Sequence, residues 1–561
     1  MIRAPVWELE SRGSGRAQYS WPGHWLGAFE QKRTSTDRQT QPKSSKMTRS
    51  GTRDLQRYLH RVEHILLRQL AKTLRPVALQ ISVSIELVAH QEAKVSKIVV
   101  CGGGVIGLCA ATMLGRDGHS VTVFEADTAA QPAVPLEGWG AWQRPGVAQF
   151  RQPHTLLSRF RMISDQELPG LTDDLLRAGC VLVDQLDSRH LPPTMMDRAS
   201  RPGDEALRLV TGRRPVVESV IAAMAEAAPN VTIRRGTKVG ELIIGPSDLA
   251  GVPHVAGVRT LSGEAVLADL VIDAMGRRSS SPEWILNAGG RGPIEEGEDC
   301  NFVYFSRYFS GPQRPRRMAP PLTPMGVFSI LTNYADNDTW SITLYTSKNK
   351  AMRALRDTAA FNRVVAACPR HAHWLDGEPI TPVLMLVGVL DRYRRFIIDG
   401  QPVITGLAAV GDAWACTNPS AGRGLAVGLL QAQILRNAAR QHVNDPGVFS
   451  RRYDEETERQ VTPFFRNQIT ADRARIAEMN ALEEGAPLPP PDPVMARLFL
   501  AAPEDADVLR GVLELAMCVA LPQEILSRPR IAAKLAELDG RPLPPDPHII
   551  DWHRMAALLD G

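Results

Sequence analysis

Three glycines have the type and spacing that nucleotide binding would need. They follow a short run of β-branched residues and form the pattern GxGxxG: Gly102, Gly104 and Gly107. In a strand–turn–helix unit, the first glycine allows the tight turn, the second lets a pyrophosphate approach the backbone, and the third lets the helix pack closely on the strand. The amides of Val105 and Ile106 would open that helix and point at the phosphates. The motif therefore predicts a dinucleotide-binding turn.

A carboxylate stands where such a unit places the one that binds ribose. Residues 97–101 and 120–124 are typical of two buried parallel strands, with a helix over residues 105–116 between them. Glu125 ends the second strand, and its side chain can accept hydrogen bonds from both hydroxyls of an adenosine ribose. Every element is in register, which favours a dinucleotide site over an ordinary glycine-rich turn. FAD and NAD both stay open here, because they share the ADP half.

A second segment, far along the chain, has the features of a flavin site. Residues 406–432 combine a strand of small residues, a Gly-Asp pair and a loop that opens a helix. Asp412 is suited to accept hydrogen bonds from a ribityl chain, and the amides from Gly422 to Leu425 can face the pyrimidine edge of a flavin. The alternative is a helix entry capped by an aspartate. The segment favours FAD, and its candidate residues are Gly411, Asp412, Pro419, Gly422, Gly424 and Leu425.

With these residues the chain resembles the FAD-dependent monooxygenases of the p-hydroxybenzoate hydroxylase type, in the superfamily with the glutathione-reductase type of FAD-binding fold. The family pattern is GDAAH followed by PxxGxGxxxGxxDA. Trp414 and Ala415 depart from it, and Gln431 stands where Asp is common. The resemblance spans about residues 96–440. The chain keeps Gly411, Asp412, Ala413, Pro419, Gly422, Gly424, Gly428 and Ala432.

The resemblance implies further cofactor contacts. Residues 268–279 are similar to the family's DAxGRxS segment, which lies close to the pyrophosphate. The residues so placed are Asp273, Gly276 and Arg277. Residues 212–221 are similar to the family's RxxLE helix start, which makes Arg214 a cofactor contact. His154 belongs to a weaker family pattern, and a structural role is the simpler interpretation for it.

Other parts of the chain must position these segments. We expect the α/β class, with a Rossmann-like FAD-binding domain over residues 96–298 and 395–440. Aromatic and β-branched runs predict an interleaved antiparallel sheet in residues 299–394, which in the family forms the floor of the substrate pocket. A helical C-terminal region, residues 441–561, would cap the pocket or mediate association. Candidates to line the pocket, with sheet core or solvent face as the alternative for each, are Tyr304, Arg307, Tyr308, Phe328 and Tyr345.

The predicted reaction follows from the cofactor. No Ser-His-Asp set, metal-ligand cluster or P-loop has a recognisable spacing, and a flavin monooxygenase needs none, so catalytic residues stay unassigned. The WxWxIP signature of the halogenases is absent, because Trp139 and Trp142 have the wrong spacing. We expect an FAD-dependent oxidoreductase, most simply a monooxygenase of an apolar or aromatic small molecule that uses reduced flavin and O2. The reductant would be NAD(P)H that docks transiently, or a partner flavin reductase.

Two other functions stay open on the sequence. A flavin-dependent reductase of a lipid-like, isoprenoid double bond would use the same cofactor site. From a different class, a non-catalytic FAD-binding protein would keep the cofactor without turnover. Substrate identity and oligomeric state are beyond the sequence.

Charge and cysteine content narrow the class of protein. The chain has 561 residues and a formal net charge of +4. Residues 1–95 hold 16 Lys and Arg against 8 Asp and Glu, so the remainder carries a small negative excess and no nucleic-acid partner is expected. The seven cysteines never form CxxC, which disfavours a disulfide framework or a zinc site. A cytoplasmic protein is the natural expectation.

The leader, residues 1–95, gives two further hypotheses. Residues 54–74 have the spacing of a basic amphipathic helix, which can lie on an anionic membrane surface or pack on the body of the protein. Because the first strand begins near residue 96, we also expect a later biological start, at Met47 or Val95.

Overall fold

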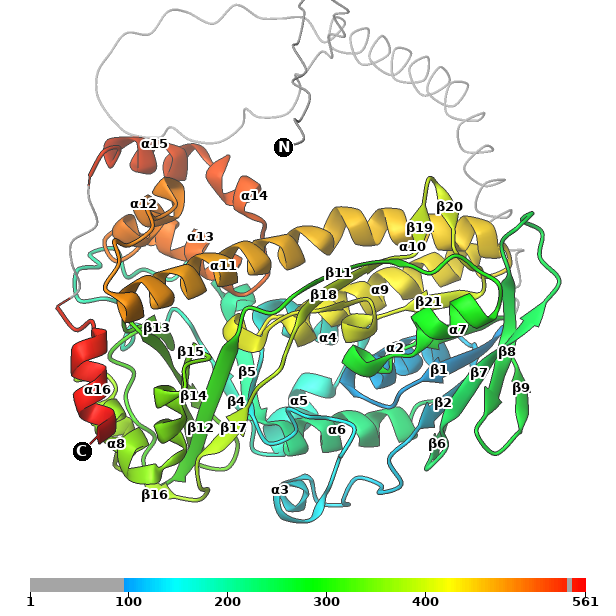
Figure 1. Ribbon diagram of the computed structural model, residues 1–561, viewed down its shortest axis with the longest axis horizontal. Coiled ribbons are helices and arrows are strands. Elements are labelled where there is room, and N and C mark those ends of the chain that lie inside the picture. The colour runs from blue at the N-terminus through cyan, green and yellow to red at the C-terminus, as the bar shows by residue number, and fades with distance from the viewer. Residues whose placement is uncertain (1–94, 542–546, 561) are drawn as a thin grey trace, which may run out of the picture. The chain divides into compact units, whose positions relative to one another are not determined.

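A parallel sheet carries both motif segments. The computed structural model describes residues 95–541 and 547–560 (Figure 1). The predicted leader helix, residues 54–74, lies outside them. The sheet has the strand order β21-β10-β1-β2-β6. In that order the strands are Leu407–Ala409, Leu270–Asp273, Lys97–Cys101, Ser120–Glu125 and Val231–Arg235.

Both faces of this sheet are covered, which explains its nearly continuous apolar strands. On one face, helix α2 (Val105–Arg116) packs between α6 (Arg214–Glu226) and α9 (Gly424–His442). On the other face a small antiparallel sheet and helix α7 (Ser281–Asn287) share a second core with the alternate strand residues. The strands of that small sheet are β7 (Val239–Gly245), β8 (His254–Thr260) and β9 (Ala265–Leu267).

The register brings the carboxyl ends of four parallel strands together. Cys101 pairs with Asp273 on one side and with Phe124 on the other, and Asp273 pairs with Ala409. Residues that follow these strands therefore emerge along one edge of the sheet. Ligands of open α/β sheets bind at this kind of edge.

An antiparallel sheet occupies the region where the sequence predicts one. Its main path is β13-β14-β15-β12-β16, and β17 also pairs with β12. The parallel sheet, the antiparallel sheets and a helical C-terminal region together confirm the mixed α/β class. The strands β12 to β17 are Phe302–Ser310, Leu322–Pro324, Phe328–Tyr334, Thr339–Ser347, Glu378–Pro379 and Leu384–Leu386.

The register sorts the five candidate pocket residues onto two faces. Tyr304 lies opposite Tyr345, and Tyr308 follows at an even spacing on the same strand, so these three tyrosines share a face. Arg307 and Phe328 lie on the opposite face. The Arg307 guanidinium there donates to the Asn362 side chain (3.0 Å) and to the Thr381 carbonyl. The five candidates therefore do not line one surface.

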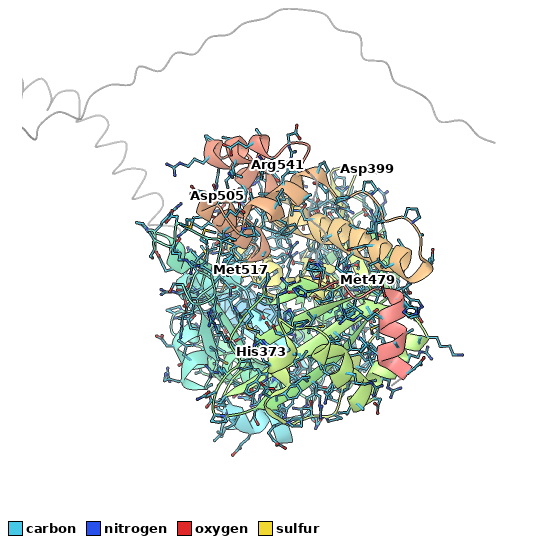
Figure 2. All side chains as sticks on the ribbon, turned by 90° about the vertical axis from the view of Figure 1, so that its left-hand side faces the viewer. His373, Asp399, Met479, Asp505, Met517 and Arg541 are labelled. Atoms are coloured by element: carbon cyan, nitrogen blue, oxygen red, sulfur yellow. The ribbon has the colours of Figure 1, made fainter. Side chains whose placement is uncertain are left out.

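Helices after residue 445 build the C-terminal region. Helix α10 (Pro446–Gln460) and α11 (Thr462–Glu484) run nearly end to end across Figure 1. Helix α11 lies on the tyrosine face, where Met479, labelled in Figure 2, shares a cluster with Tyr304 and Tyr345. Helices α12 to α15 have a small core of their own. Their bounds and that of α16 are Pro493–Ala501, Ala506–Ala516, Pro522–Leu526, Pro529–Glu537 and Trp552–Asp560.

The remaining elements connect these layers. Among the helices of residues 95–541 and 547–560, none has both the length and the apolar character that a bilayer-spanning segment requires. The other helices are α3 (Gly138–Ala141), α4 (Ser158–Glu167), α5 (Leu171–Arg177) and α8 (Thr358–Ala366). Three further strands pair in the order β3-β5-β4: Pro153–Leu156, Leu209–Arg213 and Val181–Val183. Another three pair in the order β11-β18-β22: Ile294–Glu298, Asp391–Arg395 and Ala415–Cys416.

Candidate cofactor site

The turn after β1 is crowded at its first and third glycines and open at the second. Gly102 has φ +113°, and a Cβ there would lie 2.4 Å from the Ala274 carbonyl oxygen. A Cβ on Gly107 would lie 2.1 Å from the Gly102 carbonyl oxygen. Around Gly104, by contrast, a Cβ would meet nothing within 4 Å. The backbone at Gly104 is therefore accessible to a ligand, at the N-terminus of α2.

Glu125 is held at the end of β2 beside this turn. Its Oε2 accepts hydrogen bonds from the Gly103 amide (3.0 Å) and from Arg144 (2.7 Å), and its Oε1 accepts one from the Asp127 amide (2.8 Å). These bonds fix the carboxylate, while Oε1 keeps capacity for another donor.

Arg144 is the centre of this arrangement, and the sequence did not single it out. Besides Glu125, its guanidinium contacts Asp127 (2.9 Å) and Glu218 (3.0 Å) while its side chain is only 2% exposed. Burial alone would lower the pKa of Arg144, but the three carboxylates raise it above its ordinary value. Arg144 therefore stays charged and draws β2, α6 and the residues after β2 together.

Arg214 opens α6 and is oriented by two neighbours. Its Nε pairs with Glu218 (2.5 Å), and its Nη1 lies 2.7 Å from His154 Nε2. His154 Nδ1 lies 2.9 Å from the Gln152 carbonyl oxygen. Burial and the Arg214 charge lower the pKa of His154 to about 3, so the neutral ring donates from Nδ1 and accepts from Arg214 at Nε2. His154 is thus placed as a positioning residue for Arg214.

Close backbone packing brings the second motif segment to the first. Gly411 has φ +63° and starts the single turn η6 (Gly411–Ala413) after β21. A Cβ on Gly428, in α9, would lie 2.9 Å from Ile106 Cγ1. The Gly411 amide donates to Gln431 Oε1 (2.8 Å). Gln431, the departure from the family pattern, therefore still accepts this amide.

Asp412 lies half-buried among arginines from three elements. Burial raises the pKa of Asp412, while Arg214, Arg277 and Arg392 act in the opposite direction. Arg277 belongs to the turn η3 (Gly276–Arg278), and Arg392 to β18. Arg214 is also paired with Glu218, so the excess of positive charge beside Asp412 comes from Arg277 and Arg392. Such a donor set suits an anionic ligand such as a pyrophosphate.

The predicted residues after β10 divide between interior and surface. Asp273 is fully buried, where it accepts hydrogen bonds from the Ser279 hydroxyl and from the Met275 amide (3.1 Å). Gly276 instead approaches the other segment, because a Cβ there would lie 3.9 Å from Asp412 Cβ. The structure therefore brings Gly276 and Arg277 to Asp412 and turns the Asp273 side chain inward.

The loop before α9 is open on its backbone. Gly422 follows the turn η7 (Pro419–Ala421) and has φ +67°, in the left-handed region that favours glycine. A Cβ on Gly422 or on Gly424 would meet nothing within 4 Å. Arg423 between them has a buried Nε without a hydrogen-bond partner among the described residues. The Gly422 amide is already bonded to the Pro419 carbonyl (3.0 Å), so the amides that follow it, up to Leu425 in the first turn of α9, are the ones this loop offers at a helix N-terminus.

Two curated proteins are similar to part of this chain. No family model matches the chain. Protein Rv3254 of Mycobacterium tuberculosis is 28% identical over 365 residues, which cover 61% of this chain and 72% of that protein. The 6-hydroxy-3-succinoylpyridine 3-monooxygenase HspB of Pseudomonas putida is 23% identical over 366 residues, which cover 62% of this chain and 80% of that protein.

Solved structures share the fold at low sequence identity. PqsL from Pseudomonas aeruginosa, described as a "probable FAD-dependent monooxygenase", matches in its complex with 2-aminobenzoylacetate with a TM-score of 0.50 and 15% identity, over 69% of this chain and 97% of PqsL. The chain therefore shares the fold of PqsL. The Diels-Alderase PyrE3 of pyrroindomycin biosynthesis also matches, with a TM-score of 0.51 and 18% identity over 75% of this chain and 80% of PyrE3. The predicted resemblance is thus confirmed at the level of the fold.

Proposed function

We propose that the protein is an FAD-dependent monooxygenase of an aromatic small molecule. The observation that carries the proposal is that two segments with open glycine backbone, at Gly104 and at Gly422 to Gly424, belong to helix starts that meet where Ile106 lies against Gly411 and Gly428, next to Asp412 and its arginines. The accessible amides and the excess positive charge fit a cofactor with a pyrophosphate between two ring systems. When bound, FAD would supply the redox chemistry with O2.

In this proposal, different residues bind different parts of the cofactor. The Gly102 to Gly107 turn and the first amides of α2 hold the pyrophosphate, and Glu125 binds the adenosine ribose through the free capacity of Oε1. Arg214 and Arg277 neutralise phosphate charge beside Asp412, which accepts hydrogen bonds from the ribityl chain. Asp273 acts indirectly, by shaping the turn that carries Gly276.

The pyrimidine edge of the ring is assigned to the loop before α9. The amides from Gly422 to Leu425 lie at the N-terminus of a 19-residue helix, where the helix dipole favours negative charge. Pro419 fixes the entry of this loop. The rigid aromatic face of β12 and β15, with Tyr304, Tyr308 and Tyr345, is proposed to orient an aromatic substrate.

The division into domains that the sequence predicts is part of the same proposal. Residues 96–298 and 395–440 would bind FAD, residues 299–394 would face the substrate, and the helices of residues 441–561 would cover it. NAD(P)H docking transiently or a partner flavin reductase would supply electrons, in the cytoplasm. Contact with a membrane surface through residues 54–74 is part of the same hypothesis.

Aerobic turnover tests the proposal directly. The purified chain should retain FAD, and an aromatic substrate should stimulate NAD(P)H oxidation together with oxygen uptake. A panel of hydroxylated pyridines and aminobenzoyl compounds is a suitable start, because HspB is named for a pyridine and PqsL was solved with 2-aminobenzoylacetate. FAD binding without any reaction of the reduced protein with O2 would count against a monooxygenase.

One observation favours a second candidate function. The Diels-Alderase PyrE3 shares this fold, and a cycloaddition needs no electrons from the cofactor. The non-redox alternative predicts substrate conversion that is unchanged under anaerobic conditions and without NAD(P)H. Conversion that stops when oxygen is removed excludes it.

A further inference from the structure

A buried polar cluster, formed by residues distant in the chain, lies beneath the loop before α9. Cys300, Asp391 and Asp472 are distant in the chain, yet their thiol and carboxylate atoms lie within 4.8 Å of one another. Asp391 starts β18, and Asp472 belongs to α11. All three side chains are buried. The atoms of this cluster form hydrogen bonds with one another and with residues of the loop before α9. The cluster therefore helps to hold that loop in place.

Each carboxylate of the cluster holds one residue of the loop. Asp391 Oδ1 accepts the Asn418 amide (2.7 Å), and Asp391 Oδ2 accepts the Cys300 thiol (3.2 Å). Asp472 Oδ1 accepts the Ser420 hydroxyl (2.5 Å), and Asp472 Oδ2 accepts Gln468 Nε2 (2.8 Å). The segment between β22 and Gly422 is therefore fastened to α11 and β18 from below.

The hydrogen bonds of Ser420 give Asp472 a means to act on the loop. Ser420 Oγ accepts Gln468 Nε2 at 2.7 Å and donates its single hydrogen to the ionised Asp472. A protonated Asp472 would instead donate to Ser420 Oγ and still accept Gln468 through its other oxygen. The Ser420 hydrogen would then be free for another acceptor. One proton on Asp472 thus reverses the direction of the bond between these residues.

We propose that Asp472 is a positioning residue whose proton sets the hydrogen-bond direction of Ser420 and so controls whether the loop can donate to the flavin. The proposal rests on the proposed FAD site, because the bound cofactor would have to supply the acceptor for the freed Ser420 hydrogen. The step moves a single proton between solvent and the Asp472 carboxylate, and no other bond forms or breaks. Asp472 therefore acts through Ser420 and not on the reacting atoms.

The groups around Asp472 place this change near neutral pH. Burial raises the pKa of Asp472 to about 7, against the hydrogen bonds from Ser420 and Gln468. Of the charged and titratable groups packed around it, Asp391 favours the protonated form and Arg423 the ionised form. Cys300 belongs to the same cluster, and the nearby phenols are Tyr304 of β12 and Tyr345 of β15. Burial raises the pKa of all three, so they stay neutral when Asp472 titrates.

The dissociation constant of FAD at pH 5.5 and pH 8.5, measured on the full chain, tests the proposal. For the native protein, the dissociation constant of FAD should be about fivefold higher at pH 8.5 than at pH 5.5. This difference is equivalent to the loss of one hydrogen bond of about 1 kcal/mol. The sign follows from linkage: the complex needs the proton, so affinity is full below the pKa of Asp472 and falls as the pH rises through it.

Three variants separate the control of Ser420 by the Asp472 proton, called the Asp472 relay below, from general effects of pH on FAD binding. Asp472→Asn donates to Ser420 permanently, so it should keep the tight low-pH constant at both values. Ser420→Ala has no hydrogen to donate and should show the weaker constant at both. Asp454→Asn is the matched control, because burial raises the pKa of Asp454 to about 6 and its coupled neighbours are Glu458 and Arg395, away from the loop. This control should follow the native protein.

The outcomes distinguish the relay from the FAD site itself. A pH dependence in Ser420→Ala equal to that of the native protein would overturn the relay and leave the FAD site intact. If Asp472→Asn fails to fold, Ser420→Ala still decides the question. Failure of the native chain to bind FAD at either pH would overturn the proposed function and this inference with it.

Discussion

Replacing Arg144 with Met measures how much one guanidinium that contacts three carboxylates contributes to the free energy of unfolding. Its contacts with Glu125, Asp127 and Glu218 are 2.7, 2.9 and 3.0 Å long, and the Arg144 side chain is 2% exposed. Removal of one partner from a buried ion pair typically lowers the free energy of unfolding by about 3–5 kcal/mol. Glu125 keeps two amide donors and Glu218 keeps Arg214, so we expect a value near the lower end of that range.

Urea unfolding followed by tryptophan fluorescence is the assay. The Trp142 ring lies 5.3 Å from the centre of the Arg144 guanidinium, so its emission also reports the site. Arg452, whose pair with Glu455 leaves both side chains 61% exposed, is the control. Arg452→Met should change the free energy of unfolding by less than about 0.5 kcal/mol.

A conservative variant separates charge from geometry. Arg144→Lys keeps the charge but offers a compact ammonium in place of a fork that reaches three acceptors, so it should fall between the native protein and Arg144→Met. If Arg144→Met loses no more stability than Arg452→Met, the three-carboxylate cluster does not hold β2 to α6 and the reasoning fails.

The remaining predictions concern the turn, the second segment and one histidine. Gly107→Ala should destabilise the fold by about 1–3 kcal/mol in urea titrations, because its Cβ would lie 2.1 Å from a carbonyl oxygen. Gly104→Ala should leave stability nearly unchanged and weaken FAD binding at least about tenfold by calorimetry, because the new methyl group enters open space at the proposed phosphate site. Asp412→Ala should reduce the FAD that survives gel filtration, and undiminished flavin content would refute its assignment. His154 has its pKa lowered to about 3, so its contribution to stability is present above pH 6.5 and lost as the pH falls toward 3. His154→Gln should therefore flatten the acid side of a stability–pH profile, by at most about 1.4 kcal/mol per pH unit.

Local pattern accounts for what the sequence predicted well. The GxGxxG turn and the strand that ends at Glu125 depend on residues within one strand–helix–strand unit, so their geometry can be read from spacing. The Gly411 and Asp412 segment was found for the same reason. In each case a glycine or a carboxylate follows directly after a run of apolar residues.

Long-range packing accounts for what the sequence missed. Arg144, Arg392 and Asp472 are charged residues in unremarkable local sequence, and their contacts form only when distant elements meet. The sequence did not separate the two faces of β12, for a different reason. Eight of its nine residues are buried, on both faces of the strand, so period-two alternation carried no polar and apolar contrast, and Arg307 could not be separated from Tyr304.

Charge along the sheet edge gives the proposed cofactor a direction. At the β2 end, Arg144 faces three carboxylates, while at the β21 end Asp412 faces Arg277, Arg392 and Arg214, the last of which is shared with Glu218. The β2 end therefore suits neutral donors, such as ribose hydroxyls, and the end near Asp412 suits phosphate groups. A dinucleotide with its adenosine at Glu125 and its phosphates between the two motif segments satisfies both ends. The reverse orientation would set phosphates against the carboxylate cluster. In the proposed site this polarity favours the glycine motif near residue 102 as the anchor for the adenosine half, and the loop at Ser420 to Gly424 would face the ring.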